Sequence, residues 1–355
     1  MPNHPFQEIE GEIHNLTIES AALEGNLCGD PSTRVVQLYL PKGWQDMSDL
    51  PLLVDLVGFT GSGKAHTNWK PFQENVPQRH ERLVREGEMG CCAIAFPDCF
   101  TSLGGNQYIN SIATGDWATF LIKEMITTIE ETYPVGGSPA RRGCFGKSSG
   151  GYGAIVHGML FPETWGAFAC HSGDMGWDRL FAGDFPKAVT AVEKRGGFAG
   201  FLEHIDSGLK IKGEDFHTLM ILAMGASYDP NPSAVKGVSL PVDMRTCILD
   251  EAAWQRWLSH DPVVMVERRD VQENLQSLKG IYLDCGSKDQ YNIHFGTRQM
   301  ADRLTELGIK HVHEEFDDTH SSIDYRMDHS LPFLYNALMK CTIFDKGNQG
   351  TLTKP

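Results

Sequence analysis

The sequence lacks long apolar runs, an excess of basic residues and an N-terminal leader pattern. No segment approaches the roughly 18 uninterrupted apolar residues of a membrane-spanning helix, so we expect no transmembrane segment. The first residues, MPNHPFQEIEGEIHN, contain neither a basic stretch nor an apolar core and predict no signal peptide. Acidic residues outnumber basic ones by 46 to 31, which gives a net charge of −15. This balance argues against nucleic acids and anionic membranes as partners.

A C-x-x-C motif, an internal repeat and a low-complexity tract are also missing. The nine cysteines are scattered, and several of them, such as Cys144, Cys170 and Cys285, lie within apolar runs. We interpret them as reduced, buried thiols of a cytoplasmic protein. The 355 residues, of which 41% are hydrophobic and 22% charged, suffice for a sizeable core in one large domain or two smaller ones.

Apolar runs alternate with amphipathic segments along most of the chain. The runs typical of strands lie at residues 13–18, 34–40, 51–57, 91–96, 143–145, 165–170, 280–285 and 312–316. Helical spacing of apolar residues is found at residues 117–133, 295–307 and 331–339. Strands that alternate with helices predict an α/β protein with a mostly parallel central sheet flanked by helices.

Residues 175–277 interrupt this alternation, because they contain no clear buried strand. We expect a largely helical lid insertion there, between a core of residues 1–174 and 278–345, with a flexible tail at 346–355. The lid would start at the carboxyl edge of the sheet and cover a pocket there. We expect some of its apolar side chains to line that pocket and to limit the size of the substrate: Trp177, Leu180, Phe181, Phe198, Phe201, Leu219, Met220, Leu222, Trp254 and Trp257.

The most informative stretch is residues 146–154, which read GKSSGGYGA. Gly146, Ser148 and Gly150 fill a G-x-S-x-G pattern that follows a predicted strand and opens a helix, which Pro162 ends. A strand, a sharp turn and a helix form the context in which this motif exposes a serine hydroxyl beside the N-terminus of a helix. The sequence therefore predicts that Ser148 is a catalytic nucleophile.

A serine nucleophile needs a base, and the base needs an orienting acid; in such a fold both follow the serine in the chain. His320 lies in a loop after the last predicted strand and is the expected base. Asp289 lies just beyond the end of the strand at 280–285 and is the expected acid. Asp284 lies inside that strand and is expected to be structural.

The tetrahedral intermediate of acyl transfer needs N–H donors. We expect these from the backbones of Ser149 and Phe59, the latter in the loop after the strand at 51–57. The neighbouring Gly58 and Thr60, together with His171 and Trp177 near the end of another strand, are predicted to contact the substrate.

Two other patterns point to different chemistry. Residues 58–64 match the phosphate-binding motif G-x-x-x-x-G-K, but Ala65 stands where Ser or Thr would hold magnesium, so a nucleotide-binding enzyme is the less favoured alternative. His311, His313 and Glu315 alternate along one strand and could form a metal site, although such arrays are more often plain surface. We predict no metal and no cofactor. A non-catalytic binding module remains a further alternative.

These motifs together resemble the “Putative esterase” family, which includes esterase D (S-formylglutathione hydrolase), enterochelin esterases and feruloyl esterases. The resemblance covers about residues 30–174 and 278–343. It extends to LDCGSKDQY, with Asp289, and to Thr319–His320–Ser321, whereas Val57 stands where the family usually has histidine. It implies an α/β-hydrolase fold and a serine hydrolase of small-molecule carboxylic esters that acts through an acyl-enzyme. A thioester hydrolase of the S-formylglutathione type is the alternative.

Overall fold

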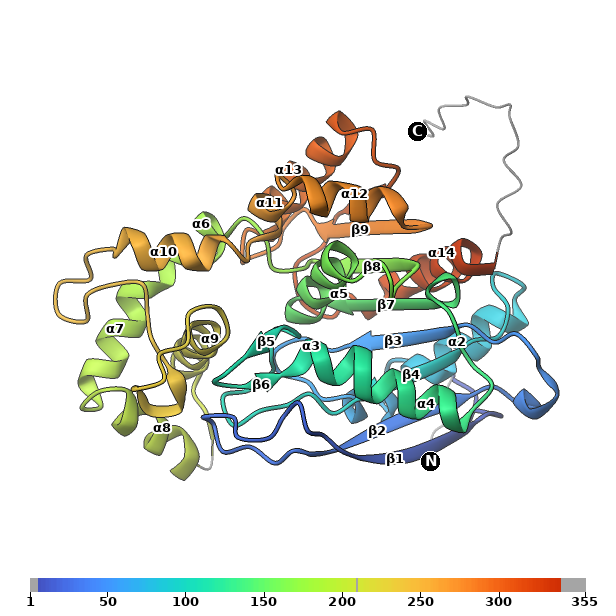
Figure 1. Cartoon of the computed structure of the whole chain (residues 1–355), viewed down its shortest axis with the longest axis horizontal. Coiled ribbons are helices and arrows are strands. Elements are labelled where there is room, and N and C mark those ends of the chain that lie inside the picture. Colours follow the sequence, from blue (N-terminus) through green and yellow to red (C-terminus); the bar gives the residue numbers. More distant parts are fainter. Residues whose placement is uncertain (1–5, 209, 340–355) are drawn as a thin grey trace.

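The computed structural model describes residues 6–208 and 210–339 and is built on an eight-stranded sheet with the order β1-β2-β4-β3-β7-β8-β9-β10. The strand β2 pairs antiparallel with both β1 and β4, and the remaining neighbours are parallel. The prediction of a mostly parallel α/β sheet is therefore confirmed (Figure 1). The strands are β1 (Glu12–Glu19), β2 (Thr33–Leu40), β3 (Leu52–Leu56), β4 (Ala93–Pro97), β7 (Arg142–Lys147), β8 (Ala167–His171), β9 (Gly280–Gly286) and β10 (Val312–Phe316). The short β5 (Asn110–Ser111) and β6 (Gly115–Asp116) form a separate pair.

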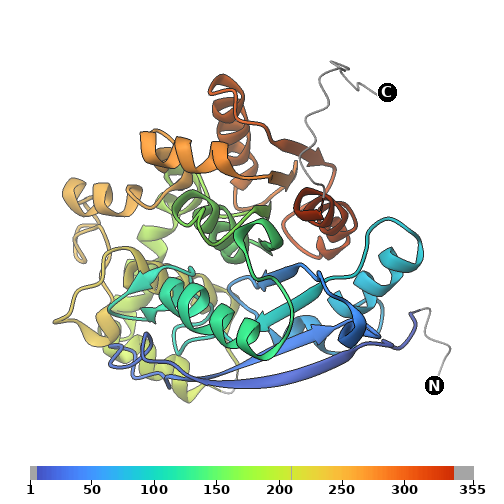
Figure 2. The same cartoon turned by 45° about the vertical axis from the view of Figure 1, so that its right-hand side comes forward.

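Helices cover both faces of the sheet, because successive side chains of its buried strands point to opposite faces. On one face pack α5 (Ser149–Leu160), α12 (Arg269–Ser277), α13 (Ile293–Glu306) and the long helical stretch α3 (Trp117–Thr119), η2 (Phe120–Met125) and α4 (Ile126–Thr132). The other face packs against α2 (Val76–Arg85) and α14 (Met327–Met339), which lie together on the right of Figure 2. The sequence patterns did not indicate α2. The predicted tail at 346–355 lies outside the described residues.

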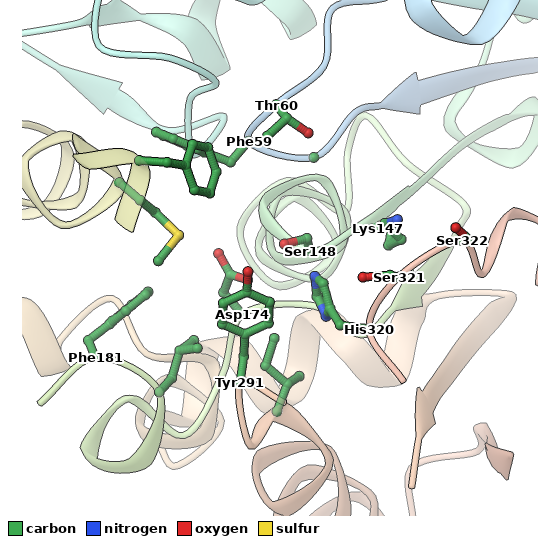
Figure 3. A pocket seen from close by; sticks show the side chains of 15 residues that line it. Phe59, Thr60, Lys147, Ser148, Asp174, Phe181, Tyr291, His320, Ser321 and Ser322 are labelled. Carbon is green, nitrogen blue, oxygen red and sulfur yellow. The ribbon is translucent and has the colours of Figure 1, made fainter. Parts of the chain in front are cut away.

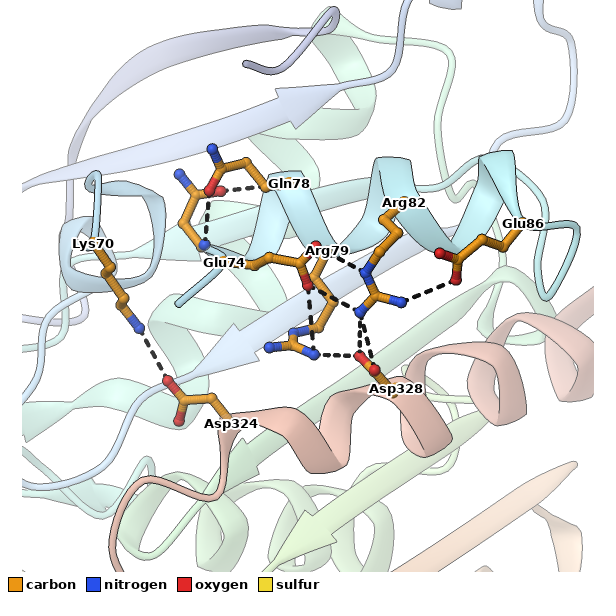
Figure 4. Close-up of polar contacts among 9 residues, drawn as sticks. Lys70, Glu74, Gln78, Arg79, Arg82, Glu86, Asp324 and Asp328 are labelled. Atoms are coloured by element: carbon orange, nitrogen blue, oxygen red, sulfur yellow. Dashed lines mark hydrogen bonds and ion pairs between the residues drawn. The ribbon is translucent and has the colours of Figure 1, made fainter. Parts of the chain in front are cut away.

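An ion-pair network joins α2 to α14 across the second face. Arg82 holds both Glu74 (2.8 Å) and Asp328 (2.8 Å), and Arg79 also pairs with Asp328 (Figure 4). Glu74 and Arg79 are buried away from water, and the ion pairs of the network compensate for the lost hydration of their charges. The network positions the start of α14 and, with it, the loop that follows β10.

The segment 175–277 consists of helices and loops between β8 and β9. Its helices are α6 (Trp177–Leu180), α7 (Phe185–Lys194), α8 (Phe198–Ser207), α9 (Gly213–Tyr228), α10 (Glu251–Leu258), α11 (Pro262–Met265) and α12. The first five lie beyond one end of the sheet, on the left of Figure 1, whereas α11 and α12 contact α5. An aromatic cluster holds the first group together: the rings of Trp177 and Tyr228 lie 4.2 Å apart, and both contact Trp257.

Candidate active site

Ser148 occupies a sharp turn between β7 and α5. Its backbone has φ 58° and ψ −125°, a strained conformation for a residue with a side chain, and its N–H donates to the carbonyl oxygen of His171 at 3.0 Å. The turn lies directly against β3: a Cβ atom at Gly150 would stand 1.7 Å from the carbonyl oxygen of Leu56, and one at Gly146 would stand 2.2 Å from it. Only glycine fits at either position, so the two motif glycines are required by the approach of β3.

Asp289 and His320 are hydrogen-bonded to each other at the same edge of the sheet. His320 Nδ1 lies 2.8 Å from Asp289 Oδ2, and Asp289 Oδ1 accepts the N–H of Tyr291 at 2.8 Å. The side chain of Gln290 accepts the N–H of His320, and the Tyr291 ring contacts the imidazole edge-on. With Nδ1 held by the carboxylate, Nε2 is left for the pocket, where Figure 3 shows His320 beside Ser148.

The Ser148 hydroxyl itself makes no hydrogen bond to His320 within residues 6–208 and 210–339. Hydrogen bonds between a nucleophile and its base are often loose before substrate binds, so proximity in one pocket is the informative observation.

A further carboxylate, Asp174, lines the pocket next to Ser148, and the sequence analysis did not select it. It is 5% exposed, and Ser149 Oγ donates to its Oδ2 at 3.2 Å. Burial raises the pKa of Asp174 to about 6, although the nearby His320 and hydrogen bonds from Ser149 and Ser148 partly oppose this rise. Asp174 follows a strand that ends at the same edge as Ser148, which is the signal that could have identified it.

Hydrogen bonds connect this carboxylate to helix α9. Gln107 Nε2 donates to Ser149 Oγ at 2.8 Å, and the Tyr228 hydroxyl donates to Gln107 Oε1 at 2.9 Å. All four side chains are buried. Ser149 is thus bonded to Asp174 on one side and to Gln107 on the other, and Tyr228 of the 175–277 segment in turn holds Gln107.

The loop after β3 lies beside Ser148. A Cβ atom at Gly58 would stand 3.5 Å from Ser148 Cβ, and the N–H of Gly105 holds the carbonyl of Phe59 at 2.7 Å. In the described part of the chain, the backbone N–H groups of Phe59 and Ser149 donate no hydrogen bond to a protein atom. Both donors are therefore available to an oxygen atom bound in front of Ser148.

Together these groups enclose a pocket of about 260 Å³ (Figure 3). Both Gly58 and Thr60, which were expected to contact the substrate, line it. The other lining residues are Phe59, Lys147, Ser148, Asp174, Leu180, Phe181, Phe216, Met220, Tyr291, Ile293, His320, Ser321 and Ser322.

Two of the predicted substrate contacts are not in this pocket, and that expectation is corrected. His171 is buried within the core, where its Nδ1 lies 2.7 Å from Asp284 and its Nε2 lies 2.8 Å from Ser330. As the last residue of β8, it still follows the alternation of the strand and points toward α14. Trp177 is fully buried in the aromatic cluster with Tyr228.

Asp284 is the centre of a second buried network rather than a partner of His320. Arg326 Nε donates to Asp284 Oδ2 at 2.9 Å, and Tyr282 OH donates to the same oxygen at 3.2 Å. Burial alone would raise the pKa of Asp284, but His171 and Arg326 outweigh that effect and lower it. The carboxylate is therefore held ionised inside the core.

The alternative patterns do not assemble a site of their own. Arg298 donates to Glu315 from Nε at 2.6 Å and from Nη2 at 2.7 Å, and His311 bonds to the carbonyl of Ile309. Across residues 6–208 and 210–339, no group of three His, Cys, Asp or Glu side chains could hold a metal ion. The helix after the glycine-rich loop, α1 (Lys64–Thr67), has a single turn, whereas phosphate-binding loops lead into a full helix. None of the helices in the described ranges is long and apolar enough to cross a membrane.

Comparison with known proteins places this geometry in context. The sequence model of the family described as “Putative esterase” matches residues 31–328. Among solved structures, a ferulic acid esterase is similar with a TM-score of 0.59 and 18% identity, covering 93% of this chain and 100% of the other. An S-formylglutathione hydrolase from Agrobacterium tumefaciens has a TM-score of 0.56 and 15% identity, covering 94% and 97%. The fluorophosphonate-binding serine hydrolase F of Staphylococcus aureus has a TM-score of 0.55 and 14% identity, covering 92% and 99%.

No curated protein sequence matches this chain. At these identities the structural neighbours establish the fold, which is the α/β-hydrolase fold that the sequence resemblance implied.

We predict that Asp284→Asn lowers the free energy of unfolding by about 3 kcal/mol, because it leaves Arg326 without its buried counter-charge. Urea unfolding measures this loss. The matched control is Asp317→Asn, which removes an exposed carboxylate paired with Lys288 and should change stability by less than about 1 kcal/mol. Equal stability of the two variants would contradict the structural role of Asp284.

The raised pKa of Asp174 predicts a pH dependence of stability. Because the native carboxyl binds its proton more tightly than the unfolded one, its contribution to stability falls as pH rises from 3.8, the ordinary pKa of an aspartic acid, to about 6, its pKa in the folded protein. Replacement by Asn removes this fall. We therefore expect the difference in unfolding free energy between Asp174→Asn and the wild type to move in favour of the variant by about 2–3 kcal/mol between pH 4 and pH 7.

Urea unfolding of both proteins at several pH values measures this difference. Asp178→Asn, an exposed position on α6, is the control and should run parallel to the wild type. Parallel curves for Asp174→Asn as well would contradict the prediction.

Proposed function

Since the chain belongs to the “Putative esterase” family, we propose that it is a serine esterase that hydrolyses small-molecule carboxylic esters through an acyl-enzyme. Ser148 attacks the acyl carbon, and His320 accepts its proton and later delivers it to the leaving alcohol. Asp289 orients the imidazole and stabilises its cation. The N–H groups of Phe59 and Ser149 bind the oxyanion. Water then releases the acid by the same steps, and this mechanism needs no cofactor.

The observation that carries this proposal is the 2.8 Å hydrogen bond between His320 Nδ1 and Asp289 in the pocket that contains Ser148. The three side chains come from separate loops after β7, β9 and β10, so their convergence is not a product of local sequence. The bond keeps the proton on Nδ1, which leaves Nε2 able to act as a base.

The strained turn at Ser148 supports the same assignment. Backbone strain of this kind costs on the order of 1–3 kcal/mol and persists at sites where the surroundings hold it in place. Here the strain points the serine out of the sheet edge, next to the first turn of α5, where free N–H groups favour a developing negative charge.

We further propose that helices α6 to α10 act as a lid over this pocket. Four lining residues belong to this part of the chain: Leu180, Phe181, Phe216 and Met220. The Phe216 ring contacts that of Phe59, so the lid reaches the loop that supplies an oxyanion donor. Most of the other lid aromatics are buried against one another. A small part of the lid therefore limits the substrate, and the rest supports it.

We predict that Ser148→Ala and His320→Ala each lower kcat/KM for p-nitrophenyl acetate by about 10⁴-fold or more, because the three residues act as a unit. Asp289→Asn should cost somewhat less. Ser148→Ala should also abolish labelling by a fluorophosphonate probe. Asp317→Asn, an exposed position in the loop that leads to His320, is the control. A folded Ser148→Ala variant with full activity would overturn the mechanism.

We predict that Phe216→Ala and Phe181→Ala change the acyl-chain preference. Each substitution enlarges the pocket, so kcat/KM for p-nitrophenyl octanoate relative to the acetate should rise by about threefold to tenfold. This rise corresponds to the burial of about one additional methylene group of the acyl chain. Phe198→Ala, in the lid but outside the pocket, is the control. A flat chain-length preference in both pocket variants would show that the lid does not set substrate size.

A further inference from the structure

The two sides of the pocket differ in charge. Figure 3 shows Lys147, Ser321 and Ser322 on the right of the Ser148–His320 pair, and Asp174, Tyr291 and Phe181 on its left. Three further apolar residues of the lid, Leu180, Phe216 and Met220, also line the pocket. The nucleophile therefore stands between a side that holds an ammonium group and an apolar side whose inner wall holds a carboxylate.

Lys147 is the last residue of β7 and directly precedes the nucleophile. Its ammonium group makes no hydrogen bond or ion pair within residues 6–208 and 210–339. The side chain is half-buried, and burial lowers the pKa of Lys147 against the opposing attraction of Asp324. Removing an unpaired cation from water is costly, so a partner at this position has a physical advantage.

The carboxylates that attract Lys147 are already paired with other groups. Asp324 is bound by Lys70 at 2.9 Å, as Figure 4 shows, and Asp289 is bound by His320 at 2.8 Å. Lys147 therefore offers the pocket a positive charge that forms no ion pair with any side chain of the described residues. The protein has a net charge of −15, which repels anions as a whole. A positive charge beside Ser148 attracts an anionic group at this one place in spite of that repulsion.

We propose that Lys147 binds a carboxylate group of the substrate, so that the preferred esters carry a carboxylate on one side of the scissile bond and an apolar group on the other. This inference rests on the proposed esterase function. The hydroxyls of Ser321 and Ser322 lie on the same side and can donate further hydrogen bonds to the anion. Asp174 repels an anion from the opposite side and thereby fixes the orientation of the ester.

The test compares charged and neutral esters of equal size. One pair carries the group in the acyl part: p-nitrophenyl hemiglutarate and the corresponding primary amide. The other carries it in the alcohol part: the butyryl esters of 4-hydroxybenzoic acid and 4-hydroxybenzamide. In at least one pair the wild type should prefer the carboxylate. Lys147→Met should reduce that preference by about 10- to 100-fold, the value of a charged hydrogen bond, and Lys147→Arg should restore most of it.

Lys64→Met removes the same charge from an exposed site outside the pocket and should leave the preference unchanged. A wild type that prefers the neutral ester in both pairs overturns the inference. An equal loss for charged and neutral esters in Lys147→Met also overturns it, since Lys147 would then act on His320 or the oxyanion. In either case labelling of Ser148 by a fluorophosphonate and hydrolysis of the neutral esters leave the esterase function intact. Absence of both labelling and hydrolysis refutes the esterase function itself.

Discussion

The close approach of three backbone segments, at Leu56, Gly146 and Gly150, is the constraint on which the rest of the site depends. The carbonyl of Leu56 occupies the space that any side chain at either glycine would need. This contact forces the turn that holds Ser148 at positive φ and brings the loop of Gly58 and Phe59 beside it. Ser148, the proposed nucleophile, and the proposed oxyanion donors are thus positioned by one packing contact between β3 and the start of α5.

Around this contact, the buried acids perform separate tasks because their surroundings differ. Asp284 is matched by Arg326 and His171 and stabilises the core. Asp289 is held by His320 and by the N–H of Tyr291 at the pocket. Asp174 has only hydroxyl donors and the more distant His320, so the cost of its burial remains and its pKa stays raised. The different surroundings of the three acids therefore follow from where each one lies relative to its strand and from which positively charged group is nearest to it.

The segment 175–277 is connected by direct contacts to the turn at Ser148. Tyr228 on α9 reaches Ser149 through Gln107, and Phe216 on the same helix touches Phe59. Movement of α9 would therefore alter the residues that supply both proposed oxyanion donors. In this arrangement the helices that we propose to limit the substrate also hold the groups that we propose to act on it, a basis for coupling substrate binding to the geometry of the turn.

The sequence by itself determined the alternation of strands and helices, the turn at Ser148, and the residues at strand ends, because these depend on local spacing and on where glycine is tolerated. It also singled out Asp289 and His320, which the fold brings within hydrogen-bonding distance. It misplaced His171 and Trp177 and passed over Asp174 and Lys147 as pocket residues. Which way a strand-end side chain points, and which charge remains unpaired, depend on neighbours distant in the chain, and only tertiary packing decides them.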